Sequence, residues 1–270
     1  MAYLNNGLSD SQAAPVVFEY HRETPFEQYD LNFVFTVKEH ESESVRLVPF
    51  IPSIHANIYF RSISAQDQLF RYLPYGPFHD LASFLTWLEI RIRSDKASVL
   101  YAVVDKTCRE QRLFVEDPRG AHPPGALAGV IGLIDTDATN LSSEVGHICM
   151  FPAFQRTHVT TQAAGLLLQW ALESPRVGGL GLRRVAWKAH LSNSASVRAA
   201  TRLGFKMEGT VRWQRVLSET KDGLVVDNAK LAALLPGKGR GRHTYLLGIC
   251  WDDWEDAGRT LVNKLMARKV

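Results

Sequence analysis

The sequence predicts a mixed α/β fold in which a largely antiparallel sheet carries helices on its flanks. Three observations lead to this prediction. Apolar stretches of strand length alternate with stretches of helical periodicity. Several of the strand-like stretches follow one another as hairpins, which gives antiparallel neighbours. The order along the chain is strand, two helices, several strands, helix, strand, helix and two strands, and this order excludes a doubly wound parallel sheet.

The composition is that of an ordinary globular protein. The chain has 270 residues, of which 46% are hydrophobic and 22% charged, and its formal net charge is +3. This mild charge gives no reason to expect a nucleic-acid partner. No apolar run approaches the roughly 18 residues of a membrane span, and the start MAYLNNGLSDSQAAP lacks the features of a secretory signal. Three widely spaced cysteines fit neither a metal site nor a disulfide framework. We therefore expect a cytoplasmic protein without a metal or a membrane partner.

The N-terminal part is expected to hold an extension followed by one strand and two helices. Residues 1–44 form the extension, in which the alternating stretch Leu31–Val37 predicts a strand. A single domain then covers 45–270. It opens with the strand-like VRLVPF and a helical stretch at Ile54–Ser64. Phe78–Arg93 has apolar residues at helical spacing on one face, which predicts an amphipathic helix.

Hairpins account for most of the remaining strands. Ser98–Val104 and Ala126–Asp135 have strand patterns, and the loop between them contains three prolines and two glycines in Asp117–Gly125. Further on, FKMEGTVRWQRVL and HTYLLGIC predict two more strands. The segment 218–241 between them contains a helical stretch, VDNAKLAALL, and the basic PGKGRGR. We interpret it as an insertion in a hairpin. A helical stripe closes the chain.

The run from Glu144 to Phe205 carries the most chemical information. The polar turn Gln155–Gln162 stands directly before an amphipathic helix that ends at Ser174–Pro175. The first turn of a helix offers free N–H groups and the positive end of the helix dipole, which together bind phosphate. Further donors come from the side chains of Arg156, Thr157, His158, Thr160 and Thr161. Taken alone, this turn favours a helix cap over a phosphate site, because nearly every helix needs a cap.

Several ordered motifs resemble the GNAT superfamily of acetyl-CoA-dependent N-acyltransferases, and most closely its RimJ/RimL-like branch. They are EVGHI on a strand, the turn QRTHVT, the helix TQAAGLLLQWAL, and NSASVRAATRLGF followed by MEG. YLPYGPF and HTYLLGICWDDW also resemble the branch, so that the resemblance covers roughly residues 45–255. It implies a GNAT fold with splayed fourth and fifth strands and acetyl-CoA as co-substrate. It also implies transfer of the acetyl group to a primary amine of a small molecule or a peptide N-terminus in a ternary complex.

The resemblance further implies where the cofactor binds. The fourth strand opens by a bulge after Glu144, and its free backbone groups pair with the pantetheine amides. The turn binds the pyrophosphate, and the asparagine that caps the next helix binds the pantetheine arm. The residues at these positions are Ile148, Cys149, Met150, Gln155, Arg156, Thr157, His158, Val159, Thr160, Asn193 and Ser196.

The turn departs from the family pattern Q/R-x-x-G-x-G/A at two positions. His158 and Thr160 stand where the family has glycine or alanine, and glycine lets a backbone approach a pyrophosphate without a Cβ in the way. If His158 adopts helical dihedral angles, the N–H groups still converge and its ring adds a donor. If it does not, the affinity for the cofactor is in question.

Glu144 is the first candidate for the general base, since it matches the family's frequent strand-four glutamate. A solvated strand-end carboxylate is the alternative. His147 and Asp135 are back-ups. Strand alternation points His147 away from Glu144, which favours a structural role, and Asp135 can simply turn the chain at its strand end. In many relatives, the general acid is a tyrosine at the position where this chain has Ala200. The remaining hydroxyl is that of Ser196, a weak acid, so water can also protonate the leaving thiolate.

The acceptor side is less defined. Tyr72, Tyr75 and Phe78 belong to the aromatic loop RYLPYGPF, which in relatives borders the acceptor cleft; a packed aromatic loop is an equally good interpretation. Cys149 is expected to be a buried, inert thiol rather than a nucleophile. Prolines and aromatic residues slightly favour a small acceptor in an enclosed pocket, and either a monomer or a homodimer fits.

Two other functions stay open. One is an acyl-CoA-binding descendant of the family that transfers another acyl group or does not acetylate. The other is an interaction module for nucleic acid or protein that uses the basic loop 236–243, which the net charge of +3 makes the weaker alternative.

Overall fold

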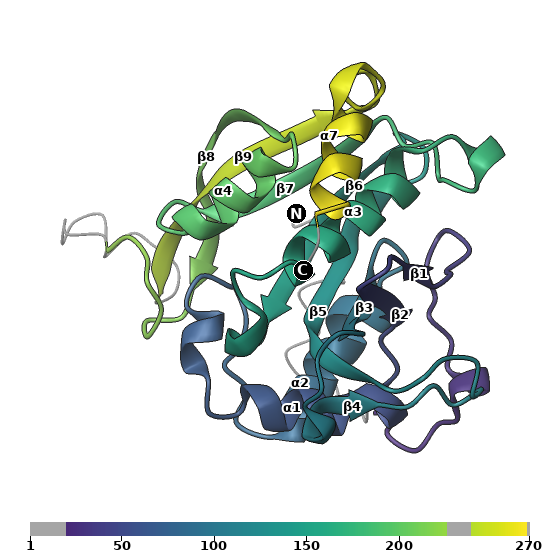
Figure 1. Cartoon of the computed structure of the whole chain (residues 1–270). Coiled ribbons are helices and arrows are strands. Elements are labelled where there is room, and N and C mark those ends of the chain that lie inside the picture. Colours follow the sequence, from purple (N-terminus) through teal and green to yellow (C-terminus); the bar gives the residue numbers. More distant parts are fainter. Residues whose placement is uncertain (1–19, 226–238, 269–270) are drawn as a thin grey trace, which may run out of the picture.

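The computed structural model describes residues 20–225 and 239–268, and these build a mixed α/β fold around one twisted sheet (Figure 1). In the described residues the sheet has nine strands in the order β1-β2-β3-β5-β6-β7-β9-β8, with the short β4 paired to β5. Every neighbouring pair is antiparallel except β6 and β7, which are parallel. The predicted fold class is therefore confirmed.

The strands are β1 (His40–Glu41), β2 (Val45–Pro49), β3 (Val99–Asp105), β4 (Phe114–Val115), β5 (Gly125–Asp137), β6 (Ser142–Met150), β7 (Arg184–His190), β8 (Lys206–Leu217) and β9 (Arg240–Cys250). The α-helices are α1 (Asn57–Ile63), α2 (Leu81–Leu88), α3 (Val159–Leu172), α4 (Ser194–Arg202), α6 (Trp251–Asp253) and α7 (Arg259–Met266). Among the described residues, no helix combines the length and the apolar character that crossing a membrane requires.

The helices that the sequence predicts form where apolar periodicity and capping residues coincide. Asp80 caps α2 by accepting a hydrogen bond from the backbone N–H of Ser83, and the apolar face of α2 buries Phe84, Leu85 and Leu88. π-helical turns extend α1 towards its N-terminus and α2 towards its C-terminus, so that both predicted helical stretches are longer than their α-helical cores.

The register of the sheet decides which side chains share a face. Tyr101 of β3 contacts Trp170 of α3, with ring centroids 6.1 Å apart, so this face of the sheet carries α3. Leu100, the residue before Tyr101 on β3, lies opposite Gly132 of β5. Ile134, two residues after Gly132 on β5, lies opposite Glu144 of β6. Because side chains alternate along a strand, Glu144 projects from the face turned away from α3.

β6 and β7 diverge immediately after Glu144. Their parallel pairing covers Ser142–Glu144 against Arg184–Ala186 and goes no further. On the other edge of β6, His147 and Ile148 together oppose the single residue Ile131, and His147 has φ +51°. This is a β-bulge, which bends its strand and re-aims the side chains beside it. The predicted opening of the strand after Glu144 is confirmed.

Leu31–Val37 does not form the predicted strand. Asn32 adopts φ +51°, and the segment makes only one backbone hydrogen bond to a neighbour, from Val34 N to Lys96 O (3.0 Å). Its alternating apolar residues instead pack as side chains on the core, where Phe33 meets Trp170. The alternating apolar residues therefore reflect burial of one side of the segment, and not pairing of its backbone in a sheet.

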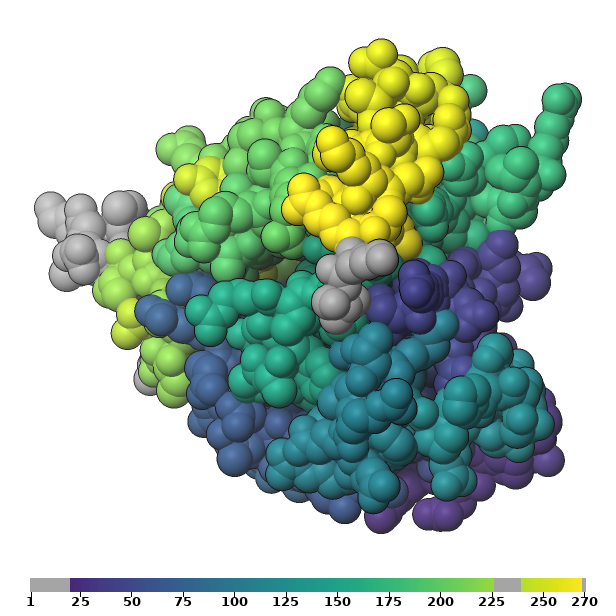
Figure 2. Space-filling model, viewed as in Figure 1, coloured from purple at the N-terminus to yellow at the C-terminus, as the bar shows by residue number. Residues whose placement is uncertain are grey.

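β8 ends at Leu217 and β9 begins at Arg240, and the two strands pair antiparallel. The predicted helical stretch VDNAKLAALL between these strands lies outside the described residues. The final helical segment lies over α3 (Figure 1), where Gln162 Nε2 donates to Met266 O at 2.7 Å. Figure 2 shows this segment, in yellow, at the surface of the molecule.

Candidate active site

The parting of β6 from β7 leaves a cavity at the centre of the sheet. Residues of both strands, of the aromatic loop before α2, of the start of α4 and of the β8–β9 hairpin line it. They include Tyr72, Tyr75, Glu144, His147, Ile148, Trp187, Lys188, His190, Asn193, Ser196, Arg215 and Arg242. A second cavity continues from the first towards α2 and adds Trp87, Ile90, Arg91, Asp95 and Asp135. Tyr75, His147 and Arg215 border both cavities.

Glu144 stands at the apex of the opening and is paired with a lysine. Lys188 Nζ lies 2.6 Å from Oε2 of Glu144 and donates to Oδ2 of Asp135 at 2.7 Å. The Glu144 side chain is 8% exposed and that of Asp135 is 59% exposed. One ammonium thus joins a buried and an accessible carboxylate, and the alternative of a solvated strand-end Glu144 does not apply.

Burial and the ion pairs have opposite effects on the pKa of each of the three groups. Burial raises the pKa of Glu144, and Lys188 offsets only part of that effect. Burial also acts to raise the pKa of Asp135, but Lys188 outweighs it and the pKa is lowered. Burial acts to lower the pKa of Lys188, yet the two carboxylates reverse this and the pKa is raised. Of the two carboxylates, Glu144 is therefore the one that takes up a proton more readily.

His147 occupies the same cavity as Glu144, so the prediction that it points away is wrong. The bulge at φ +51° breaks the alternation on which that prediction rested. Its Nδ1 lies 3.1 Å from the hydroxyl of Tyr75, and its ring packs against Trp87. Burial, with the nearby charge of Arg215, lowers the pKa of His147 to about 4. The ring is therefore neutral at neutral pH.

The predicted phosphate turn adopts a geometry that accommodates its two unusual residues. His158 has helical dihedral angles, φ −64° and ψ −26°, and makes no side-chain cap at the start of α3. The left-handed conformation of the turn falls instead on Arg156, with φ +61°. A Cβ at position 158 is thus compatible with a helical first turn, and no side chain of the N-cap residue occupies the N–H groups there.

The side chains of the turn have distinct partners. The His158 ring turns inward, with Nε2 3.7 Å from Oδ1 of Asp105, and does not extend the turn outward as an extra donor. Gln155 Nε2 donates to Met150 O at 3.0 Å, and the Thr157 hydroxyl donates to Phe154 O at 2.7 Å. Arg156 is exposed, Thr160 is partly exposed, and Val159 is buried.

Two residues near these sites were missed by the sequence analysis. Lys188 follows Trp187 on β7, and its partnership with Glu144 depends on a parallel register that no local pattern specifies. Arg202, at the end of α4, donates to the hydroxyl of Thr161 at 2.9 Å and brings a guanidinium to the first turn of α3. Its spacing of four from Arg198 on a short helix was the available signal.

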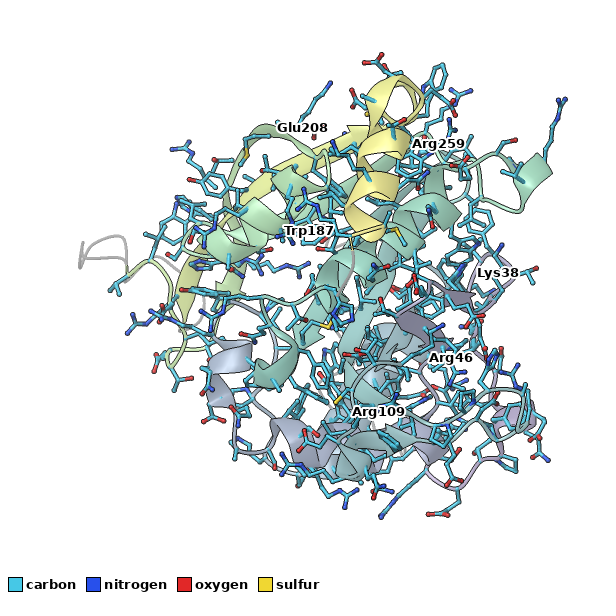
Figure 3. The ribbon with its side chains drawn as sticks, viewed as in Figure 1. Lys38, Arg46, Arg109, Trp187, Glu208 and Arg259 are labelled. Atoms are coloured by element: carbon cyan, nitrogen blue, oxygen red, sulfur yellow. The ribbon has the colours of Figure 1, made fainter. Side chains whose placement is uncertain are left out.

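The start of α4 lies as predicted for Asn193. Its side chain accepts a hydrogen bond from Ser196 N at 3.1 Å and caps the helix. Trp187 projects from β7 towards α4 (Figure 3), and its Nε1 donates to the Ser196 hydroxyl at 2.9 Å. That hydroxyl keeps its own proton to donate, and both Asn193 and Ser196 line the first cavity. Ala200 is buried.

The remaining predicted residues divide between cavity wall and core. Ile148 lines the cavity, whereas Cys149 is buried and its burial raises the pKa of the thiol to about 11, which fits the expected inert thiol. Tyr72 and Tyr75 line the cavity. Phe78 lines neither cavity and packs on Phe70, Tyr75, Phe84 and Trp87.

One group of potential metal ligands occurs in the described part of the chain. The ligand atoms of Cys250, Asp252 and Asp253 lie within 4.8 Å of one another. Asp253 already pairs with Lys206 and accepts a hydrogen bond from Cys250 N at 3.1 Å. None of these residues borders either cavity.

Comparison with solved structures places this arrangement among acetyltransferases. A probable GNAT-family acetyltransferase from Chromobacterium violaceum is 28% identical, with a TM-score of 0.62, over 80% of this chain and 88% of that one. A GCN5-related N-acetyltransferase from Brucella melitensis is 26% identical, with a TM-score of 0.64, over 84% of this chain and 85% of that one. Spermidine N-acetyltransferase from Vibrio cholerae, solved with CoA and spermine, shares the fold at 13% identity and a TM-score of 0.54, over 80% of this chain and all of that one. No curated protein matches the chain.

The family model of the acetyltransferase (GNAT) domain matches residues 44–206. This range holds the splayed strands, the turn before α3, and Glu144 with its lysine partner. The chain is therefore a member of the GNAT acetyltransferase family, and an acyltransferase.

Proposed function

We propose that the protein transfers an acetyl group from acetyl-CoA to a primary amine, by direct attack of the amine in a ternary complex. The observation that carries this proposal is the buried Glu144 at the point where β6 and β7 part, beside a cavity that passes between the two strands. The motifs YLPYGPF and NSASVRAATRLGF favour the RimJ/RimL-like branch. The acceptor in that proposal is a small molecule or a peptide N-terminus.

The residues present fit the cofactor. His158 leaves the helical first turn of α3 without an N-cap side chain, although Val159 N donates to the Thr157 hydroxyl at 3.3 Å, and Arg156 and Arg202 add positive charge there. Within the described residues, the edge of β6 that turns away from β5 has no strand partner beyond Glu144, so backbone groups there can pair with an extended ligand. When bound, acetyl-CoA supplies the acetyl group as an activated thioester.

Glu144 receives the proton in this proposal. The attacking nitrogen must lose one proton as its bond to the acetyl carbon forms, and the sulfur leaves as the C–S bond breaks. A carboxylate with a raised pKa is a better proton acceptor than an ordinary one. Lys188 favours the ionised form of Glu144 against the effect of burial, while the Ser196 hydroxyl, or water, can return a proton to the sulfur.

Calorimetric titration with acetyl-CoA and with CoA tests the cofactor half of the proposal. We expect micromolar binding to the wild type and none to Thr160→Glu, whose carboxylate would lie in the first turn of α3 and repel a phosphate. Thr139→Glu, an exposed turn residue, is the matched control and should bind normally. Absence of binding to the wild type would overturn the proposal.

Steady-state acetylation tests the catalytic half. Glu144→Gln should lower kcat/KM by about 100-fold or more and leave the Kd for acetyl-CoA unchanged. The exposed Glu43→Gln should match the wild type. Binding of acetyl-CoA without acetylation of any amine would favour instead a descendant that carries another acyl group or only binds the cofactor.

A further inference from the structure

The walls of the two cavities carry more positive than negative charge. In the described residues, four cationic side chains and three carboxylates border them: Arg91, Lys188, Arg215 and Arg242 against Asp95, Asp135 and Glu144. Lys188 pairs with both Asp135 and Glu144 and offsets one of their two negative charges. Asp95 is occupied by the hydroxyl of Ser98 and by the backbone N–H of Ala97. None of the three guanidinium groups forms an ion pair with a carboxylate among the described residues, although Arg242 and Arg215 lie within the electrostatic influence of Glu144.

Two of these guanidinium groups are cross-strand neighbours. Arg215 of β8 lies directly opposite Arg242 of β9 in the antiparallel register. Like charges in directly opposed positions destabilise a sheet. Arg242 is only 6% exposed, and within residues 20–225 and 239–268 its Nε has no hydrogen-bond partner. A buried cation facing a second cation is costly unless an anion joins them.

The position of this pair assigns it to the acceptor and not to the cofactor phosphates. Lys188 contacts Glu144 and lies opposite Leu246 of β9. Alternation along β9 then puts Arg242 on the same face as Glu144, which is the face turned away from α3. Arg215 also borders the second cavity, which is walled by Trp87, Ile90 and Arg91 of the α2 region. The phosphate turn is at the start of α3 on the other face.

We propose that the acceptor is a primary amine that also carries an anionic oxyacid group, a carboxylate or a phosphate, and that Arg242 and Arg215 bind this group. This inference rests on the proposed function. A planar guanidinium binds such a group through two parallel hydrogen bonds, and one anion can neutralise both arginines. The same positive wall disfavours polyamines, although a spermidine acetyltransferase shares the fold.

Matched acceptor pairs test the inference in a single acetylation assay. The carboxylate arm compares phenylalanine with phenylalaninamide, the phosphate arm compares O-phosphoethanolamine with ethanolamine, and spermidine is the cationic probe. In at least one arm we expect the anionic member to have a kcat/KM at least 10-fold above its neutral partner, corresponding to about 1.4 kcal/mol or more, and spermidine to be poorest. The arm that shows the larger ratio distinguishes carboxylate from phosphate.

Arginine variants show whether the preference comes from this pair. Arg242→Gln and Arg215→Gln should each remove most of the preference, by raising KM for the anionic member only. Arg212→Gln, on the same strand but exposed and bordering neither cavity, should keep it. Arg215 is exposed, so its variant should fold even if Arg242→Gln does not.

A binding measurement makes the result independent of turnover. Saturation-transfer NMR with the CoA-loaded protein should detect binding of N-acetylphenylalanine or N-acetylated O-phosphoethanolamine, and no binding of their neutral counterparts. The signal of the bound anionic product should be lost in Arg215→Gln. Equal use of neutral and anionic amines, or a preference that survives both variants, would overturn the inference and leave the proposed function intact. Failure to bind acetyl-CoA would instead overturn the proposed function.

Discussion

At the scale of single residues, the site depends on a cation that stabilises a buried carboxylate. Glu144 is too buried to stay ionised easily, and Lys188 is the group that opposes this effect most strongly. Asp135 holds Lys188 from the accessible side. Removing one partner of a buried ion pair leaves an uncompensated charge, which costs more than the pair itself contributes. Lys188 is therefore coupled both to the protonation of the base and to stability.

Lys188→Met should move the acidic limb of the pH profile of kcat/KM to higher pH. Without the ammonium, burial raises the pKa of Glu144 further, so the carboxylate that accepts the proton appears only at higher pH. The free energy of unfolding should fall by about 3–5 kcal/mol. The measurements are pH–rate profiles and urea unfolding at neutral pH.

Lys206→Met is the control, because Lys206 is exposed and pairs with Asp253 outside the cavities. It should leave the acidic limb where it is. An acidic limb that stays in place or moves to lower pH in Lys188→Met would show that Glu144 is not the group that limits the rate on the acid side.

At the scale of elements, a lysine of the β8–β9 hairpin holds the aromatic loop against the site. Lys221 Nζ donates to three backbone carbonyls, those of Phe70 (2.7 Å), Leu73 (2.8 Å) and Tyr75 (2.7 Å). The side chain is buried. An ammonium has three protons to donate. Lys221 thus pairs the carbonyls of Leu73 and Tyr75 and adds a second donor to that of Phe70, which also accepts from Leu73 N at 3.1 Å. Lys221 therefore holds the loop that carries Tyr72 and Tyr75.

Lys221→Met should loosen this loop and lower the free energy of unfolding by about 1–3 kcal/mol, because buried carbonyls lose their donor. The KM for the acceptor should rise while the Kd for acetyl-CoA stays the same, since Tyr72 and Tyr75 border the cavity. Limited proteolysis should show earlier cleavage near residues 70–78. Urea unfolding, acceptor kinetics and calorimetry provide the readouts.

Arg71→Gln is the matched comparison in the same contact. Arg71 pairs with Asp222 at 2.6 Å, but both side chains are exposed. Solvent screens such a pair, so its loss should be much milder than that of Lys221. Equal effects of the two variants would show that the loop depends on the hairpin surface and not on the buried ammonium.

At the scale of the whole molecule, the C-terminal segment is part of the same folding unit as the site. Trp254 is fully buried and its Nε1 donates to Oε1 of Glu173, at the end of α3, at 3.2 Å. Arg259 pairs with the same carboxylate at 2.7 Å. At the other end of the contact, Gly165 leaves space for Met266, whose sulfur would lie 2.4 Å from an added Cβ. α3 is thus held along its length while its first turn stays accessible.

Trp254→Ala should lower the free energy of unfolding by about 3–5 kcal/mol, because it leaves a large cavity between α3 and the C-terminal segment. The Kd for acetyl-CoA of the folded protein should not change, since Trp254 borders neither cavity. Trp251→Ala is the control: its side chain is 55% exposed, and the change should stay within about 0.5 kcal/mol. Thermal unfolding and calorimetry decide; a large effect of Trp251→Ala would contradict the packing argument.

The sequence by itself determined the fold class, the order of nearly all helices and strands, the capping of α4 by Asn193 and the position of Glu144. These features depend on local patterns, namely periodicity, turn residues and motif spacing, and such patterns are present in the amino-acid sequence itself. It also determined that β6 opens after Glu144, through the family resemblance. The same local logic failed at Leu31–Val37, because burial on one side produces alternation whether or not the backbone pairs in a ladder.

Only the tertiary structure decided which distant groups meet. The parallel register of β6 and β7 joined Lys188 to Glu144, and the antiparallel register of β8 and β9 set Arg215 against Arg242. A bulge turned His147 into the cavity, since one extra residue reverses the side of a strand on which a side chain lies. The helical dihedral angles of His158 showed how a turn without glycine can lead into the first turn of α3. Register, bulges and dihedral angles depend on packing between segments far apart in the sequence, and local patterns do not encode them.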